Sequence, residues 1–160
     1  MRDLSHIDQQ GKSRMVNVGD KTKCQRIAKA QVTVCFPPRV FATLQKNQLA
    51  SAKGSITDTA NIAGIMAAKR TADLIPMCHP LPIDFCKLSF TTMEQKSSLI
   101  IQAEVRVIHK TGVEMEALTA ASVAALTVYD MCKALSHNIY INDLHLVNKI
   151  GGKSDFKMDS

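Results

Sequence analysis

Residues 114–135 read EMEALTAASVAALTVYDMCKAL, and this stretch decides the fold. Its alanines recur at spacings of three and four residues, which places them in one stripe along a helix. The stripe consists of Ala117, Ala120, Ala121, Ala124 and Ala125. Because these side chains are small, the stretch predicts a helix that lies close against a sheet or a second helix.

A pair of strands comes before this helix. Residues 83–90 and residues 99–107 both alternate in polarity, and the polar segment 94–98 separates them. Alternation with one wet face is typical of antiparallel strands. We therefore expect a hairpin over residues 83–107, and a last strand from the apolar positions of residues 139–147.

The N-terminal half supplies another strand and two helices. Residues 26–36 alternate as a half-buried strand, which Pro37-Pro38 ends. A short helix is expected around residues 40–44, and a second one runs to Lys69 after an N-cap at Asp58 or Thr59. Gly64 is unfavourable inside that helix, which we interpret as the close approach of another backbone.

These elements follow the order β-α-α-β-β-α-β. That order predicts an α+β fold of the ferredoxin-like plait type, with an antiparallel sheet and helices on one face. The 160 residues fit a single domain, with a flexible arm at residues 1–20 and a flexible tail at residues 150–160. Because one sheet face would stay uncovered, we expect self-association.

Composition limits the binding partners and the cellular location that the protein can have. The net charge of +6 indicates an anionic partner, which leaves nucleic acid, nucleotide phosphates and anionic lipid open. The apolar runs are too short to span a bilayer, and the N-terminus lacks the apolar stretch of a secretory signal. Five cysteines without a repeated spacing predict neither a disulfide framework nor a zinc site. We expect a cytoplasmic protein without a metal.

Four groups of residues are candidates for chemistry, and one of them is the entry to the 114–135 helix, Thr111-Gly112-Val113-Glu114-Met115-Glu116. Asp130 and Lys133 are neighbours on the 114–135 helix, and Glu116 lies within roughly 40° of Asp130 around it. A carboxylate beside an amine can tune a general acid or base, whereas an ordinary surface ion pair is the simpler interpretation.

The other two groups lie outside that helix. Cys78 and His79 stand in a loop stiffened by three prolines over residues 76–82, where a buried structural histidine is the alternative. Lys149, Gly151, Gly152 and Lys153 could wrap a phosphate or form a solvated basic tail. Lys53 and Lys69 are further candidates for phosphate binding.

Several blocks resemble the molybdenum cofactor biosynthesis protein C family, the cyclic pyranopterin monophosphate synthases. They read LIPMCHP at residues 74–80 and KTGVEMEALTAASVAALTVYDMCKA at residues 110–134. The similarity extends from LSHID at residues 4–8 to GGKS at residues 151–154. Cys24 replaces a usual Thr, Asn61 replaces a larger polar residue, and the tail reads GGKSD rather than GGKSGD.

The resemblance implies a lyase that converts 3′,8-cyclo-7,8-dihydro-GTP into cyclic pyranopterin monophosphate and pyrophosphate. It implies a hexamer, a trimer of dimers, with active sites at subunit interfaces. It also implies three groups of site residues. The catalytic residues would be Lys53, Asp130 and Lys133. The pocket residues would be Cys78, His79, Glu114, Met115 and Glu116. The residues that hold the triphosphate would be Lys69, Lys149, Lys153 and Arg26.

Two other classes of function are alternatives to this enzyme: an RNA-binding module and a structural or regulatory oligomer. RNA recognition motifs share the plait, but they stack bases on aromatic side chains of central strands, and the seven aromatics here are scattered. A structural or regulatory oligomer would not need Lys53, Asp130 and Lys133. We therefore expect an enzyme with a nucleotide-derived substrate, no nucleic acid or membrane partner, and no cofactor beyond a possible Mg²⁺ on the phosphates.

Overall fold

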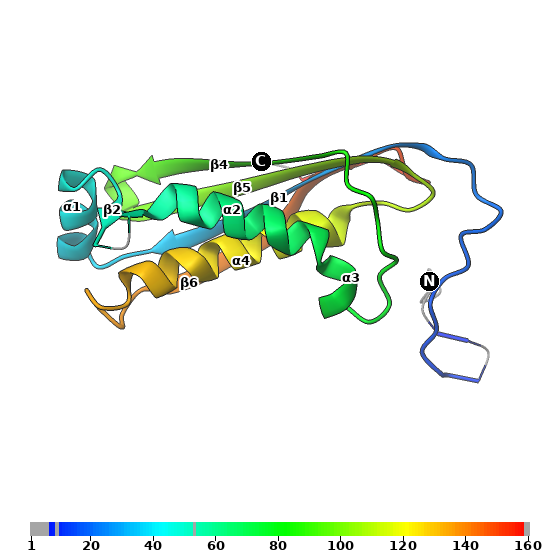
Figure 1. The fold of residues 1–160 in the computed structure, drawn as a ribbon, viewed down its shortest axis with the longest axis horizontal. Coiled ribbons are helices and arrows are strands. Elements are labelled where there is room, and N and C mark those ends of the chain that lie inside the picture. Colours follow the sequence, from blue (N-terminus) through cyan, green and yellow to red (C-terminus); the bar gives the residue numbers. More distant parts are fainter. Residues whose placement is uncertain (1–6, 9, 53, 159–160) are drawn as a thin grey trace.

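A five-stranded antiparallel sheet organises the protein, in the order β4-β5-β1-β6-β7 (Figure 1). The computed structural model describes residues 7–8, 10–52 and 54–158. The long strands are β1 (Cys24–Cys35), β4 (Phe85–Met93), β5 (Ser98–His109) and β6 (Tyr140–Ile150). Strand β5 lies between β1 and β4, which is the split connection of the predicted plait. The α+β class and the antiparallel sheet are confirmed.

Two long helices cover one face of the sheet. Helix α2 (Ile56–Lys69) and helix α4 (Glu114–Cys132) run antiparallel to one another across it (Figure 1). The shorter elements are α1 (Pro38–Lys46), β2 (Ala50–Ser51), β3 (Gly54–Ser55), α3 (Thr71–Leu74), a 3₁₀ turn at Glu94–Lys96 and β7 (Phe156–Lys157). Among the described residues, no helix has the length and apolarity needed to cross a membrane.

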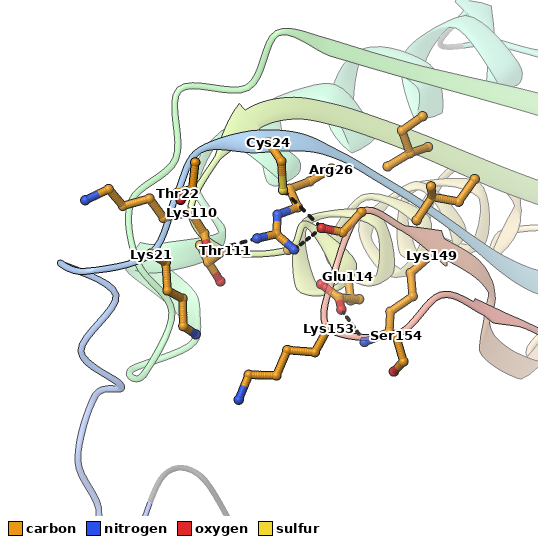
Figure 2. A pocket seen from close by; sticks show the side chains of 15 residues that line it. Lys21, Thr22, Cys24, Arg26, Lys110, Thr111, Glu114, Lys149, Lys153 and Ser154 are labelled. Atoms are coloured by element: carbon orange, nitrogen blue, oxygen red, sulfur yellow. Dashed lines mark hydrogen bonds and ion pairs between the residues drawn. The ribbon is translucent and has the colours of Figure 1, made fainter.

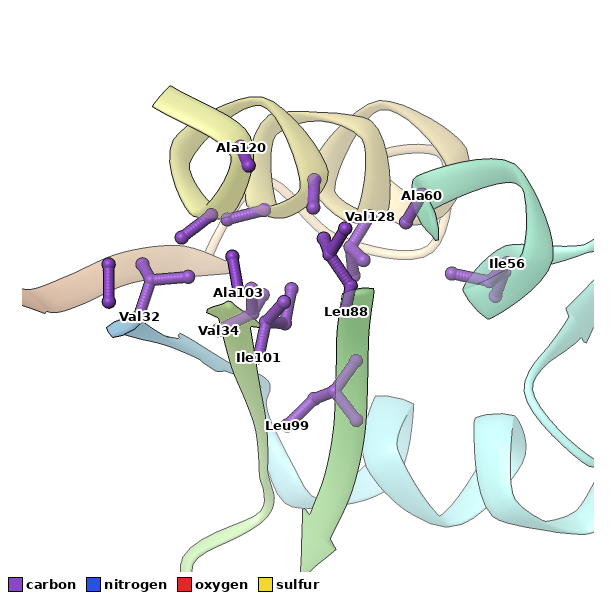
Figure 3. Close-up of a cluster of buried hydrophobic side chains, with 14 of the residues drawn as sticks. Val32, Val34, Ile56, Ala60, Leu88, Leu99, Ile101, Ala103, Ala120 and Val128 are labelled. Atoms are coloured by element: carbon purple, nitrogen blue, oxygen red, sulfur yellow. The ribbon is translucent and has the colours of Figure 1, made fainter. Parts of the chain in front are cut away.

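The core fills the space between the sheet and the two helices (Figure 3). All five alanines of the predicted stripe are fully buried, and they face the alternating residues of β1 and β5. On β1 these are Ala28, Ala30, Val32 and Val34, as the polarity pattern predicted. A Cβ on Gly64 would lie 2.6 Å from Leu88 Cδ2 and 3.0 Å from the Ala120 carbonyl oxygen, which confirms the expected close approach.

The boundaries of two helices differ from the prediction. Helix α2 begins earlier than expected, because Ser55 and not Asp58 or Thr59 is its N-cap: Ser55 Oγ accepts a hydrogen bond from Asp58 N at 3.2 Å. Helix α4 ends at Cys132, so Lys133 caps it instead of lying inside it. The connection expected to be extended over residues 74–82 is so only in its second half. Leu74 ends the short helix α3, and Cys78 N then donates to the Ile75 carbonyl oxygen at 3.0 Å in a turn, whereas residues 78–83 have no regular secondary structure.

The other face of the sheet carries polar and charged side chains. Glu104 Oε2 lies 3.5 Å from Lys29 Nζ, and its Oε1 accepts from Arg106. Gln102 Nε2 donates to Gln31 Oε1 at 2.8 Å. The described elements leave this face open, and its self-association stays a prediction.

Candidate active site

Two adjoining hollows lie at the end of the molecule where β6 ends and α4 begins. The first has a volume of about 540 Å³ and the second about 500 Å³. They share a wall made of Lys21, Thr111, Gly112, Glu114, Lys149 and Lys153. The shared wall makes the two hollows parts of one site.

The first hollow is strongly cationic. Figure 2 shows its basic side chains around the turn that follows β6. They are Lys21, Arg26, Lys110, Lys149 and Lys153. Glu114 faces them, and its Oε1 lies 3.1 Å from Lys149 Nζ. So many positive charges around one hollow favour a ligand with several negative charges, such as a chain of phosphates.

Arg26 holds the wall of this hollow together. Its guanidinium donates to the carbonyl oxygens of His109 at 3.3 Å, of Lys110 at 3.2 Å and of Gly151. These three carbonyls belong to the end of β5, the segment after it and the turn after β6. Arg26, which the resemblance assigns to phosphate binding, thus lines the hollow. Part of its hydrogen-bond donor capacity is used on these backbone carbonyls.

The tail that follows β6 contributes to the site although it is one Gly shorter than the family pattern. Residues 151–154 turn back, and β7 pairs with β6 through Asn148–Lys157 and Lys149–Phe156. Lys153 and Ser154 line the first hollow as a result. The flexibility predicted for residues 150–160 stays a prediction.

The second hollow combines the Cys78-His79 loop with the first turn of α4. Met77, Cys78, His79 and Leu81 line it from the loop, and Glu114, Met115 and Glu116 line it from the helix. Glu114 reaches this position because its side chain folds over Gly112, where a Cβ would lie 2.0 Å from Glu114 Oε2. The sequence motif TGVEME thus brings two carboxylates to one cavity.

Glu116 is the most perturbed acid of this cavity. Only 4% of its surface is exposed, and burial, with a further contribution from the negative charge of Glu114, raises its pKa to about 7. Burial also raises the pKa of Cys78, and the charge of Glu116 raises it further. Groups with pKa values shifted in this way in a cavity are typical of catalytic and binding sites.

A third, smaller hollow of about 300 Å³ lies on the other side of the loop. Leu81 and Glu116 line both this hollow and the second one. Lys69, at the end of α2, lines the third hollow. Every residue predicted to bind substrate therefore lies along these three adjoining cavities.

Two of the predicted catalytic residues, Asp130 and Lys133, lie away from these cavities. Asp130 Oδ1 and Lys133 Nζ are 2.7 Å apart at the far end of α4, and both side chains are more than half exposed. Fourteen residues separate Glu116 from Asp130, which corresponds to about 21 Å along a helix. The hydrogen bond and charge of Asp130 raise the pKa of Lys133. Lys53 lies outside the described residues.

Some residues of the site were not predicted. Lys21, Thr22 and Lys110 line the first hollow, beside Thr111 and Ser154 of the two segments that the sequence had indicated. Lys110 Nζ also donates to the carbonyl oxygen of Gly19, which fastens the N-terminal segment beside the cavity. Lys110 directly precedes the TGVEME motif in sequence, and that proximity was a usable signal. Lys21 lies in a polar segment without any such signal.

Metal ligands do not gather in the part of the chain that the structure describes. No three side chains of His, Cys, Asp or Glu come together there as a metal site requires. The expected absence of a metal or other cofactor stays a prediction, as does a Mg²⁺ ion on bound phosphates.

Comparison with known proteins gives a consistent result. Residues 15–152 match the model of the MoaC family. The chain is 55% identical to a cyclic pyranopterin monophosphate synthase of Xanthomonas axonopodis pv. citri over 95% of its length and 92% of that protein. It is 46% identical to the synthase of Thermomicrobium roseum over 96% of its length and 92% of that protein. It also matches 27% of the length of molybdenum cofactor biosynthesis protein 1 of Drosophila melanogaster, with 49% identity.

Proposed function

The chain belongs to the MoaC family, and from this premise we propose that it converts 3′,8-cyclo-7,8-dihydro-GTP into cyclic pyranopterin monophosphate with release of pyrophosphate. It is an enzyme, a cyclic pyranopterin monophosphate synthase of molybdenum cofactor biosynthesis. The observation that carries the proposed substrate is the joining of a cationic hollow to a hollow with two carboxylates. A triphosphate attached to a guanine-derived ring system has the complementary chemistry.

The triphosphate occupies the first hollow in this proposal. Lys149 and Lys153 bind its oxygens, with Lys21 and Lys110 close by in the same wall. An internal hydroxyl attacks the α-phosphorus, the α–β bridging P–O bond breaks, and pyrophosphate leaves. Fixed ammonium groups stabilise the charge that develops on the leaving pyrophosphate. Lys149 exchanges its contact with Glu114 for the phosphate.

The ring system occupies the second hollow. Its guanidine-like edge donates hydrogen bonds, and the carboxylates of Glu114 and Glu116 are the acceptors available there. Cys78, His79 and Met115 close this part of the cavity around the ring. The raised pKa of Glu116 suits a group that exchanges a proton with the substrate near neutral pH.

Ring opening and closure need repeated proton transfers, which we assign to Lys53, Asp130 and Lys133. Asp130 positions Lys133 through their 2.7 Å ion pair. Since this pair lies about 21 Å along α4 from Glu116, we propose that a second subunit supplies it. A hexamer built as a trimer of dimers, located in the cytoplasm, provides such interfaces.

Unpartnered apolar side chains support this association. On the helical layer, Ile62, Met66 and Leu126 are about half exposed or more in the single chain. Monomeric proteins seldom leave such large apolar side chains exposed on neighbouring elements without a partner.

The experiment is a conversion assay with enzymatically prepared 3′,8-cyclo-7,8-dihydro-GTP. Pyrophosphate release and pterin fluorescence after oxidation are followed for the wild type and for Lys53→Ala, Lys133→Ala and Lys149→Ala. We expect product from the wild type and none from the three variants, because each removes a group on which proton transfer or the departure of pyrophosphate depends. A folded, oligomeric wild type that forms no product would refute the proposal.

An RNA-binding function has less support. Base stacking in RNA recognition motifs needs aromatic side chains on the central strands, and the described strands β1 and β5 carry none.

A further inference from the structure

The backbone of Gly151 is held on both sides of its Cα. Its N–H donates to Asp155 Oδ1 at 2.9 Å, and its carbonyl oxygen accepts from the Arg26 guanidinium and from Cys24 Sγ, the latter at 3.1 Å. Hydrogen bonds to ionised groups are among the strongest in proteins. The cysteine that replaces the family's usual Thr keeps a donor at this point.

Gly151 also fits its place too tightly for any other residue. Its φ angle is +88°, and a Cβ there would lie 1.9 Å from the carbonyl oxygen of Gln25. The turn is therefore pressed against the backbone of β1, in a conformation that favours glycine. Gly151, the first residue of the turn, therefore has a fixed position.

The turn presents two side chains to the cationic hollow. Lys153 and Ser154 line the cavity, and the chain then returns through Asp155 into β7. Asp155 closes the turn by binding the N–H of Gly151 four residues earlier. A lysine on a closed turn loses less conformational freedom on binding an anion than a lysine on an open tail.

We infer that Asp155 is a positioning residue, which sets the turn of residues 151–154 so that Lys153 can bind the phosphates of the substrate. The inference rests on the proposed function, since it assumes that this hollow takes phosphates. Electrostatics alone predicts that the removal of Asp155 has the opposite effect on phosphate binding. A carboxylate close to a phosphate site weakens anion binding, and its removal should then strengthen it.

Binding of inorganic triphosphate, measured by calorimetry, separates the two expectations. For Asp155→Ala we expect the Kd to rise about five- to tenfold because the turn opens. Asp155→Asn keeps an acceptor oxygen and should bind at least about half as tightly as the wild type. An Asp155→Ala variant that binds as tightly as the wild type, or more tightly, would overturn the inference. Triphosphate that does not bind the wild type would overturn it as well.

A double-mutant cycle tests whether Asp155 acts through Lys153. Lys153→Ala alone should weaken triphosphate binding, and adding Asp155→Ala should then change the Kd by less than about twofold. Full additivity of the two effects would contradict the inference. Amide hydrogen exchange supplies a local readout, because the Gly151 N–H should exchange faster in Asp155→Ala while the core amides keep their protection.

Turnover distinguishes this inference from the proposed function. Asp155→Ala should raise KM with kcat changed by less than about twofold, as expected for lost uniform binding. If the wild type binds triphosphate but forms no product, the proposed reaction fails and the binding cycle still decides the role of Asp155.

Discussion

At the scale of single residues, Glu116 connects the fold to the chemistry. The helix stripe that buries five alanines also carries this carboxyl into the protein, at the boundary between two cavities. An ionised carboxylate is costly in such a place, so its proton is held more tightly than in water. As a result, the free energy of unfolding depends on pH, and this dependence can be measured.

The wild type should lose stability as the pH rises, and we expect Glu116→Gln to abolish this loss. Between about pH 4.5 and pH 7, the folded carboxyl keeps a proton that the unfolded carboxyl has released. The free energy of unfolding therefore falls as the pH rises through this window. A shift of that size corresponds to about 3 kcal/mol. Urea unfolding of both proteins at pH 4.5 and pH 7.5 gives the difference, and parallel pH dependences would contradict it.

At the scale of elements, the contact between α2 and α4 depends on Gly64. The backbone carbonyl of Ala120 and the side chain of Leu88 both occupy the space that a larger residue would need. This contact keeps the first turn of α4, with Glu114 and Glu116, in a constant position against the sheet.

We expect Gly64→Ala to destabilise the protein by about 1–3 kcal/mol through overpacking. Helix propensity alone predicts the opposite sign, a gain of about 1 kcal/mol. Ala63→Gly, at the adjacent position of the same helix, is the matched control, and it should cost about 1 kcal/mol from propensity. Denaturant unfolding of the three proteins decides, and a stabilised Gly64→Ala would show that the helices can move apart.

Patterns within the sequence predicted these elements where one face of a strand or helix is buried. The alternation of β1 and β5 and the alanine stripe of α4 each specify which side chains enter the core. The cap of α2 was missed although Ser55 and Asp58 have the spacing of a capping motif. Strand β7 has two residues, too few to show any periodicity.

The candidate site was predictable only to the extent that its residues stand in recognisable motifs. The Cys78-His79 loop and the TGVEME segment meet at one cavity, as the resemblance implied. Lys21 could not be assigned, because a lysine on a polar segment has no pattern that distinguishes a ligand from a solvated charge. The position of Lys110 directly before the TGVEME segment was, in contrast, a usable signal. The distance of about 21 Å between Asp130 and Glu116 follows from the rise of the helix. If both residues act in one site, a second subunit must supply one of them.

At the scale of the whole molecule, the Asp130–Lys133 pair and the carboxylates of Glu114 and Glu116 occupy opposite ends of α4. Strand β2 lies at the same end of the molecule as the C-terminal end of α4 (Figure 1), which carries Asp130 and Lys133. The cationic hollow lies at the other end, where β6 leads into residues 151–154 (Figure 2). In the proposed mechanism one chain therefore holds two partial sites, which two chains in opposite orientation combine into complete ones.

This arrangement predicts complementation between two inactive variants. Lys149→Ala damages the phosphate end, and Lys133→Ala damages the proton-transfer end. In a dimer that contains one of each, one site carries both changes and the other carries neither. Random pairing of co-expressed chains should thus restore about a quarter of the wild-type activity, as expected for twofold symmetry with shared sites.

The measurement compares co-expressed, doubly tagged oligomers with a mixture of the two separately purified variants. The separately purified proteins should stay inactive until their subunits exchange. A site built within one chain gives no recovery in any mixture, because every chain then carries one damaged site of its own. Recovery near a quarter would instead require that Asp130 and Lys133 of one subunit act on substrate bound at the Lys149 end of another.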